Sequence, residues 1–151
     1  MYRKNTLAIR LLAIALIVAL ALPLGANAAV AETVQPCASD YLSSYNAYVS
    51  VAGSGKIEVY YSVSGTGYID SIGVKSIAIY ESTNNSSWTW KKTFTSSSTP
   101  SMMSYNDCYH SGHVTYQGVA GRYYKAYVNI WGGDNGAGDN RYIWTSVKQA
   151  T

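Results

Sequence analysis

The chain has 151 residues, of which only 13% are charged, and 11 basic against 8 acidic side chains give a net charge of +3. All of the excess lies in the first 28 residues, which contain Arg3, Lys4 and Arg10 but no acidic residue. The remainder is formally neutral, which argues against nucleic acid as a partner.

Residues 1–28 have the features of a secretory signal peptide. The three cations precede an apolar run over residues 11–24, and Ala26, Asn27 and Ala28 supply the small residues of a cleavage site. We expect cleavage after Ala28, secretion to the extracellular space, and a single domain over residues 29–151. No lipid-attachment cysteine or second apolar segment follows, so we expect no membrane anchor after cleavage.

The composition of residues 29–151 favours strands and polar turns. Tyrosine, serine, threonine, glycine and asparagine dominate, and the chain has 15 tyrosines but one phenylalanine. Two cysteines in an oxidising compartment are more often bridged than free, so we expect a disulfide between Cys37 and Cys108.

The first two predicted strands form a hairpin. Residues 45–51 alternate between apolar and polar, and residues 56–63 do the same with Ile57, Val59, Tyr61 and Val63 on one face. Residues 53–55, with the sequence GSG, provide the tight connection between them.

The side-chain alternation changes parity in the next segment. Ile72 and Val74 share one parity, whereas Ile77 and Ile79 share the other. A bulge or loop is therefore expected near residues 75–76.

The rest of the chain predicts more strands and no helix. We expect residues 95–111 to form a long connection with one helical turn at most, and residues 132–140 to form a glycine-rich turn. This pattern predicts an antiparallel β-sandwich of about seven strands. The remaining expected strands are residues 76–81, 88–94, 114–116, 122–131 and 142–147.

The sequence GRYYKAYV at residues 121–128 refines that prediction. It is typical of the corner at which the sixth strand of immunoglobulin and fibronectin type III domains begins, with Tyr124 placed to hydrogen-bond back across the turn. The alternative is an aromatic-rich strand that simply follows a glycine turn.

Four segments together resemble a family of small secreted proteins from Gram-positive, clostridial-type bacteria. They are NNSSW at residues 84–88, MMSYN at 102–106, HSGHV at 110–114 and VAGRYYKAYV at 119–128. The resemblance spans nearly all of the chain after the signal peptide and implies secretion and a compact β domain. That family is a domain of unknown function, so the resemblance implies no catalytic residue, and Cys37 and Cys108 are not part of its pattern.

The sequence DCYHSGH at residues 107–113 is the strongest candidate for metal or nucleophile chemistry. A disulfide would consume Cys108, and His110 and His113 alone leave a metal site short of ligands. Two exposed histidines without a metal are the simpler interpretation, and we expect no metal and no cofactor.

Oxygen-rich and acidic residues give no stronger case for catalysis. The sequence DNGAGDN at residues 134–140 lacks the bidentate glutamate of an EF-hand and is explained by a glycine-rich turn. Glycoside hydrolysis needs two carboxylates across a cleft, and Glu58, Asp70 and Glu81 are candidates only because acids are few. We therefore do not expect an enzyme.

An outward aromatic row gives a better case for binding. If Tyr124, Ala126, Val128 and Ile130 face the core, then Tyr123, Tyr127 and Trp131 face outward, and Tyr142 and Trp144 lie on the next strand with matching parity. Such a patch suits sugar rings or a protein partner. The alternative is that tyrosine merely packs beside its cross-strand neighbours.

These observations predict a secreted, non-enzymatic binding or structural module with an unknown extracellular partner. The leading candidate ligand is carbohydrate, as cell-wall or other extracellular glycan, and the candidate binding residues are Tyr127, Trp131, Tyr142 and Trp144. The alternative function is a secreted antagonistic factor of bacteriocin type, by analogy of fold.

Overall fold

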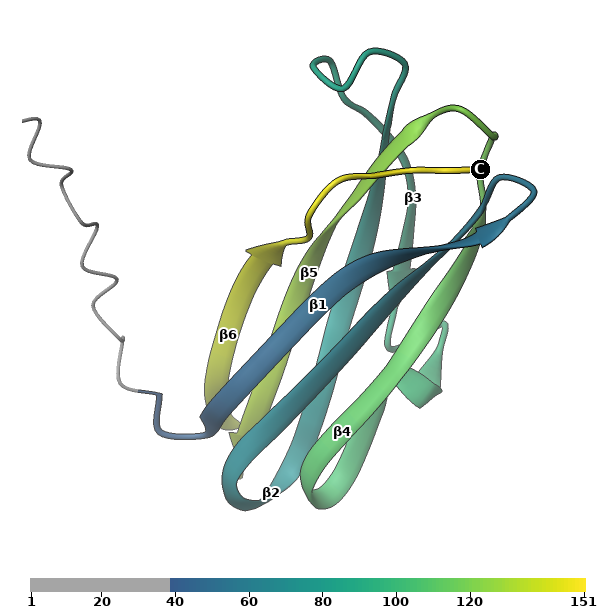
Figure 1. Cartoon of the computed structure of the whole chain (residues 1–151). Coiled ribbons are helices and arrows are strands. Elements are labelled where there is room, and N and C mark those ends of the chain that lie inside the picture. Colours follow the sequence, from purple (N-terminus) through teal and green to yellow (C-terminus); the bar gives the residue numbers. More distant parts are fainter. Residues whose placement is uncertain (1–38) are drawn as a thin grey trace, which may run out of the picture. The chain divides into compact units, whose positions relative to one another are not determined.

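The computed structural model describes residues 39–151, which form an antiparallel all-β fold (Figure 1). The predicted signal peptide and Cys37 lie outside the described residues. Hydrogen bonds join the strands into one curled sheet, a half-barrel, and no helix in residues 39–151 is long and apolar enough to cross a membrane. The elements are β1 (Leu42–Gly53), β2 (Lys56–Ser82), β3 (Thr89–Thr95), the 3-10 turn η1 (Pro100–Met102), β4 (Met103–Gln117), β5 (Tyr123–Asp134), β6 (Ala137–Trp144) and β7 (Lys148–Gln149).

Strand β2 organises the fold because it pairs with four other strands. Its first part lies between β1 and the end of β4, and its second part pairs with β5 on one side and with β3 and the start of β4 on the other. The sequence predicted separate strands at residues 56–63 and 76–81, whereas the chain continues as one strand of 27 residues. Only the pairing with β4 is interrupted, over residues 65–68.

The predicted bulge near residues 75–76 is confirmed. The register of β2 against β5 shifts between Val74 and Ser76, which leaves Lys75 as the extra residue. One inserted residue reverses the alternation of side chains between the two faces. Val74 and Ile77 are therefore both fully buried although they differ in parity.

The hydrophobic core lies on the concave side of the curled sheet and receives every second side chain of the long strands. From Ala47 onward on β1 and in the first part of β2 the buried positions have odd numbers, and on β5 from Tyr124 to Gly132 they have even numbers, as the alternation predicted. Leu42 is buried at an even position because the register of β1 shifts between Leu42 and Ser44. The fully buried valine and isoleucine side chains are Val49, Ile57, Val59, Val63, Ile72, Val74, Ile77, Ile79, Val128 and Ile130.

The predicted hairpin between β1 and β2 is confirmed, and its turn depends on backbone conformation. Gly53, Ser54 and Gly55 all have positive φ angles, of 80°, 53° and 77°. Glycine adopts such angles without steric cost, which explains its place on both sides of Ser54.

The hydrogen bond that was predicted to run from Tyr124 back across the turn is present. The Tyr124 ring is fully buried on β5, and its hydroxyl accepts a hydrogen bond of 2.8 Å from the backbone N–H of Val119, five residues earlier. The same hydroxyl donates to the carboxylate of Glu81 on β2.

The connection expected at residues 95–111 is present with one helical turn, η1, but it is shorter than predicted because β4 already begins at Met103. The strand was not visible in the sequence because its inward positions include a glycine. A Cβ on Gly112 would lie 2.5 Å from the hydroxyl oxygen of Tyr61, so the Tyr61 ring occupies the space of the missing side chain.

The turn expected at residues 132–140 is present but is also shorter than predicted. The turn consists of Asn135 and Gly136, with φ angles of 48° and 81°, and the flanking residues belong to β5 and β6. Gly132 is buried within β5 because the Leu42 side chain lies 2.6 Å from where its Cβ would be. This glycine serves close packing rather than chain reversal.

Candidate functional site

Four aromatic side chains form a continuous surface on the outer face of three neighbouring strands, and we call it the platform. It consists of Tyr80 on β2, Tyr127 on β5, and Tyr142 and Trp144 on β6. The ring centroids of Tyr127 and Trp144 are 4.7 Å apart, those of Tyr127 and Tyr142 are 5.7 Å apart, and those of Tyr80 and Trp144 are 5.1 Å apart. Tyr142 and Trp144 remain 55% and 51% exposed.

The strand register explains why these rings meet. Tyr127 lies directly opposite Trp144, and Tyr142 lies opposite Asn129, two residues along the same outward face of β5. The intervening residues, Val128 and Ile143, turn toward the core. Cross-strand pairs on one face of a sheet are close enough for rings to touch.

One cation contacts the platform at its edge. The ammonium group of Lys125 lies 4.4 Å from the centroid of the Trp144 ring and 4.3 Å from that of the Trp88 ring. Attraction between a cation and the negative face of an aromatic ring holds both rings in place. The platform is therefore a set of rings fixed by their neighbours on rigid strands.

The structure brings together three of the four predicted binding residues and separates the fourth, Trp131. The Lys75 ammonium lies 3.1 Å from the centroid of the Trp131 ring, and the indole N–H donates a 2.9 Å hydrogen bond to the Ser71 hydroxyl. The indole also lies so close to Gly138 that a Cβ there would be 2.5 Å from it. Trp131 is thus covered by Lys75 and packed against Gly138, and burial beside it lowers the pKa of Lys75.

The sequence did not reveal Tyr80 as part of the platform. Its outward parity was visible in residues 76–81, but its neighbours depend on the pairing of β2 with β5, in which it lies opposite Lys125. No local signal fixes that register.

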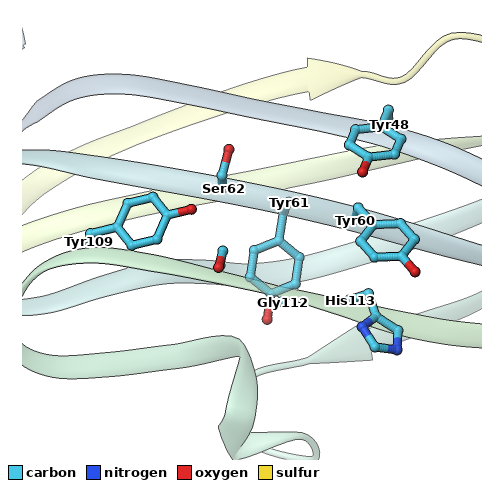
Figure 2. A pocket seen from close by; sticks show the side chains of 8 residues that line it. Tyr48, Tyr60, Tyr61, Ser62, Tyr109, Gly112 and His113 are labelled. Atoms are coloured by element: carbon cyan, nitrogen blue, oxygen red, sulfur yellow. The ribbon is translucent and has the colours of Figure 1, made fainter.

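The two histidines lie in β4, and their side chains point to opposite faces of the sheet. The His113 ring faces outward and stacks on Tyr60 with centroids 5.0 Å apart, next to a hollow in the sheet surface (Figure 2). His110 Nε2 lies 3.0 Å from the carbonyl oxygen of Ser101. Among residues 39–151 no three histidine, cysteine, aspartate or glutamate side chains gather in a way that could hold a metal ion.

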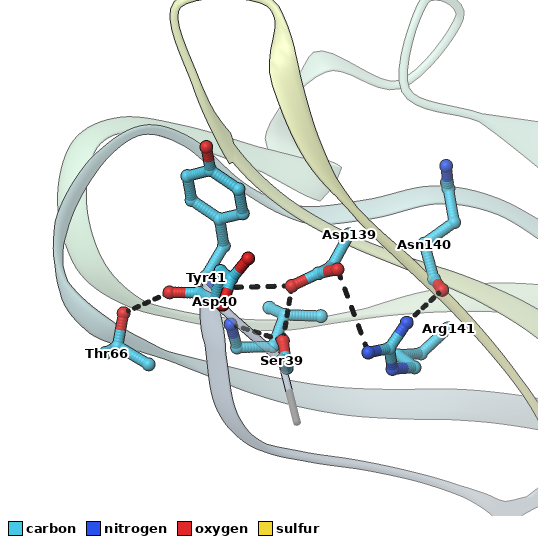
Figure 3. Close-up of polar contacts among 8 residues, drawn as sticks. Ser39, Asp40, Tyr41, Thr66, Asp139, Asn140 and Arg141 are labelled. Carbon is cyan, nitrogen blue, oxygen red and sulfur yellow. Dashed lines mark hydrogen bonds and ion pairs between the residues drawn. The ribbon is translucent and has the colours of Figure 1, made fainter. Parts of the chain in front are cut away.

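Asp139, near the β5–β6 turn, connects the start of β1 to β6. The Asp139 carboxylate accepts hydrogen bonds from the Ser39 hydroxyl and, at 3.1 Å, from the Tyr41 N–H, and it lies 3.7 Å from the Arg141 guanidinium (Figure 3). The Ser39 hydrogen bond is the main reason that the pKa of Asp139 is lowered. These contacts fasten the start of β1 to β6.

The three carboxylates considered for hydrolysis also have structural partners. Glu58 accepts a 2.7 Å hydrogen bond from the Tyr60 hydroxyl, and the Asp70 carboxylate accepts one of 2.6 Å from the N–H of Asn135. The hydrogen bond from Tyr124 lowers the pKa of Glu81, which opposes a general-acid role.

Cys108, the described partner of the predicted disulfide, is half-buried in β4 and forms no disulfide within residues 39–151. Because Cys37 lies outside this range, the Cys37–Cys108 pairing stays a prediction.

No family model matches the chain, and no curated protein sequence matches it. Among solved structures, the crystal structure of a family 76 glycoside hydrolase from a bovine Bacteroides thetaiotaomicron strain is similar over 71% of this chain, with 17% identity and a TM-score of 0.31. The match covers 20% of that chain, so this protein corresponds to about a fifth of its length. Similarity at this level carries no argument about fold or activity.

Proposed function

We propose that this protein is a secreted, non-enzymatic module that binds extracellular glycan, with cell-wall glycan as its ligand, through the platform. The observation that carries the proposal is the contiguity of Tyr80, Tyr127, Tyr142 and Trp144 across three strands. Pyranose rings present faces of C–H groups, which stack on aromatic rings, so a row of rings on rigid strands suits a linear polysaccharide.

The charge around the platform favours a ligand without strong charge. Lys125 is the cation that contacts it, and this ammonium already lies over two tryptophan rings. Asn129 and Ser76, which flank Tyr127 on the outward side of the sheet, are uncharged. Hydroxyl groups beside exposed rings match the alternating apolar and polar surface of a sugar.

We also propose that the fold is an immunoglobulin- or fibronectin-type sandwich, in which the two parts of β2 belong to opposing layers. Two observations support this arrangement. The first part of β2 pairs with β1 and the second with β5, and Tyr124 makes the hydrogen bond of a tyrosine corner. Nuclear Overhauser contacts between the buried side chains of β1 and β5 would test it, and their absence would contradict it.

A pull-down experiment tests the binding function. Secreted protein is mixed with three insoluble probes, namely Gram-positive peptidoglycan with its attached wall polymers, chitin and cellulose. We expect retention on wall material and at least about a tenfold loss of affinity for Trp144→Ala and Tyr142→Ala, since central aromatic anchors carry most of the energy of an interface.

Tyr68→Ala is the matched control for Tyr142→Ala, because Tyr68 is 79% exposed and belongs to no cluster described above. It should bind as the unaltered protein does. Failure of the unaltered protein to bind any probe, or equal binding by Trp144→Ala, would refute the proposed function. Growth inhibition of Gram-positive bacteria without glycan binding would favour an antagonistic factor instead.

A further inference from the structure

A second group of rings lies on the outer face of β1, the first part of β2 and the end of β4. Tyr48, Tyr60 and His113 lie directly opposite one another on these three strands. The centroids of the two tyrosine rings are 5.3 Å apart with planes 10° apart, and His113 stacks on Tyr60 at 5.0 Å. We call these three side chains the ladder.

A hollow of about 330 Å³ lies beside the ladder (Figure 2). Its floor includes Ser62 and Ser111, which pair across β2 and β4. Tyr109, which is 50% exposed, lies on the far side of these two serines from the ladder. Tyr109 and His113 are four residues apart on one strand, which corresponds to about 13 Å at the rise of a β-strand. Small hydroxyl residues thus separate two aromatic boundaries.

The walls and floor of the hollow are held in place from both sides of the sheet. The Tyr60 hydroxyl donates to Glu58 at 2.7 Å, which fixes the orientation of the ring and is the main reason that the pKa of Tyr60 is raised. Below the floor, the buried Tyr61 ring covers Gly112 and donates to the Ser101 carbonyl at 3.2 Å. A site held in this way loses little entropy when a ligand binds.

The chemistry of the lining selects the class of ligand. The residues that line the hollow include no lysine, arginine, aspartate or glutamate, and Glu58 at its edge is engaged by Tyr60. This lining holds no permanently charged side chain to pair with an ionic ligand, and the row of hydroxyls is unsuited to a purely apolar one. Ring faces together with hydroxyl groups suit a neutral sugar, and the volume is at the lower end of the range of about 300–1,000 Å³ for small-ligand sites.

We propose that the hollow is a second carbohydrate site, which binds one or two neutral pyranose residues against Tyr109 and the ladder. The ladder and the platform face away from the same core, because Val49 and Val59 alternate with the ladder residues and Val128 alternates with Tyr127. The two sites therefore lie on opposite sides of the core. Building on the proposed function of the platform, one molecule would hold two glycan chains at once.

Nuclear magnetic resonance titration separates the hollow from the platform. The probes are chitohexaose, cellohexaose and xylohexaose at about 10 mM, a concentration that detects millimolar affinity. In Trp144→Ala we expect at least one probe to shift the backbone signals of residues 109–113. The additional change Ser111→Trp, which fills the hollow from an exposed position, should abolish those shifts, and Thr83→Trp at an exposed site beyond the end of β2 should not.

The outcomes for the two sites are distinguishable. If residues 109–113 do not shift in Trp144→Ala with any probe, or if Ser111→Trp leaves the shifts intact, the hollow is not a sugar site, whatever the platform does. If the unaltered protein shows shifts at residues 109–113 but none on β5 and β6, the platform proposal fails and the hollow stands.

Bridging has its own measurement, the aggregation of beads that carry the oligosaccharide bound in the titration. The unaltered protein should aggregate them, and Trp144→Ala or Ser111→Trp alone should leave them dispersed. Aggregation that persists in either variant, or dispersed beads with unaltered protein that binds at both sites, would overturn the bridging inference.

Discussion

Replacing Tyr124 with phenylalanine removes one oxygen atom that joins three parts of the fold. The hydroxyl accepts the N–H of Val119 at 2.8 Å and donates to Glu81, whose carboxylate also lies 3.4 Å from the Lys91 ammonium. A neutral hydrogen bond contributes about 0.5–1.5 kcal/mol and one to a charged group about 1.5–3 kcal/mol. We therefore expect Tyr124→Phe to lower the free energy of unfolding by about 2–4 kcal/mol at neutral pH.

The loss should depend on pH in both directions. The Tyr124 hydrogen bond lowers the pKa of Glu81, so its stabilisation is present above the unfolded pKa and disappears as the pH falls through the lowered value. Burial, and then the Glu81 hydrogen bond, raise the pKa of Tyr124 to about 12. The stabilisation from Tyr124 is therefore present below its ordinary pKa of 10 and is lost as the pH rises toward 12. A rise of about two pKa units corresponds to a loss of about 3 kcal/mol in the free energy of unfolding.

Urea unfolding followed by tryptophan fluorescence at about pH 3, 7 and 11 measures this profile. The difference between the unaltered protein and Tyr124→Phe should be largest at pH 7 and smaller at both extremes. Tyr116→Phe is the matched control, because the Tyr116 ring lies 6.1 Å from that of Tyr124 and its hydroxyl has no hydrogen bond within residues 39–151. A difference below about 0.5 kcal/mol at pH 7, or one independent of pH, would refute the reasoning.

Two further outcomes are expected. Gly112→Ala should lower the free energy of unfolding by about 1–3 kcal/mol, because the added Cβ would lie 2.5 Å from the Tyr61 hydroxyl. Gly67→Ala, a control with open space around the added Cβ, should change the free energy of unfolding little. Equal urea midpoints for the two variants would contradict this expectation. Alkylation of protein purified without reductant should label neither Cys37 nor Cys108 if they are bridged, and both after reduction; labelling before reduction would exclude the disulfide.

The sequence predicted those parts of the fold in which one face carries large aliphatic side chains. Residues 45–51 and 56–63 alternate cleanly because Val49, Val59 and Val63 are fully buried while their neighbours face water. The bulge at Lys75 was visible for the same reason, since aliphatic residues on both sides of it differ in parity.

The same reasoning failed where glycine occupies a core-facing position. Gly112 in β4 and Gly132 in β5 provide no side chain, because Tyr61 and Leu42 fill the space that one would occupy. In the sequence such glycines are typical of loops and turns. Their packing role becomes visible only when the strands that supply the covering side chains are placed.

The candidate sites show the limit of parity as a guide. Parity within single strands placed Tyr127, Tyr142 and Trp144 on outward faces, but Tyr80 joins them through pairing between β2 and β5. The ladder depends on pairing between Tyr60 and His113, which are 53 residues apart in the sequence. Such a register is determined by the whole sheet and not by local sequence.

The bulge at Lys75 affects both the platform and Trp131. Tyr60 and Tyr80 both have even numbers and both face outward on β2. Between them, the buried positions of β2 change from odd to even numbers at residues 69–72 and back to odd numbers at residues 74–77. Without the second change, at Lys75, Ile77 and Ile79 would face water and Tyr80 would face the core. The same extra residue places its ammonium over the Trp131 ring. The bulge that keeps Tyr80 in the platform therefore also places Lys75 over Trp131, the candidate binding residue that lies outside the platform.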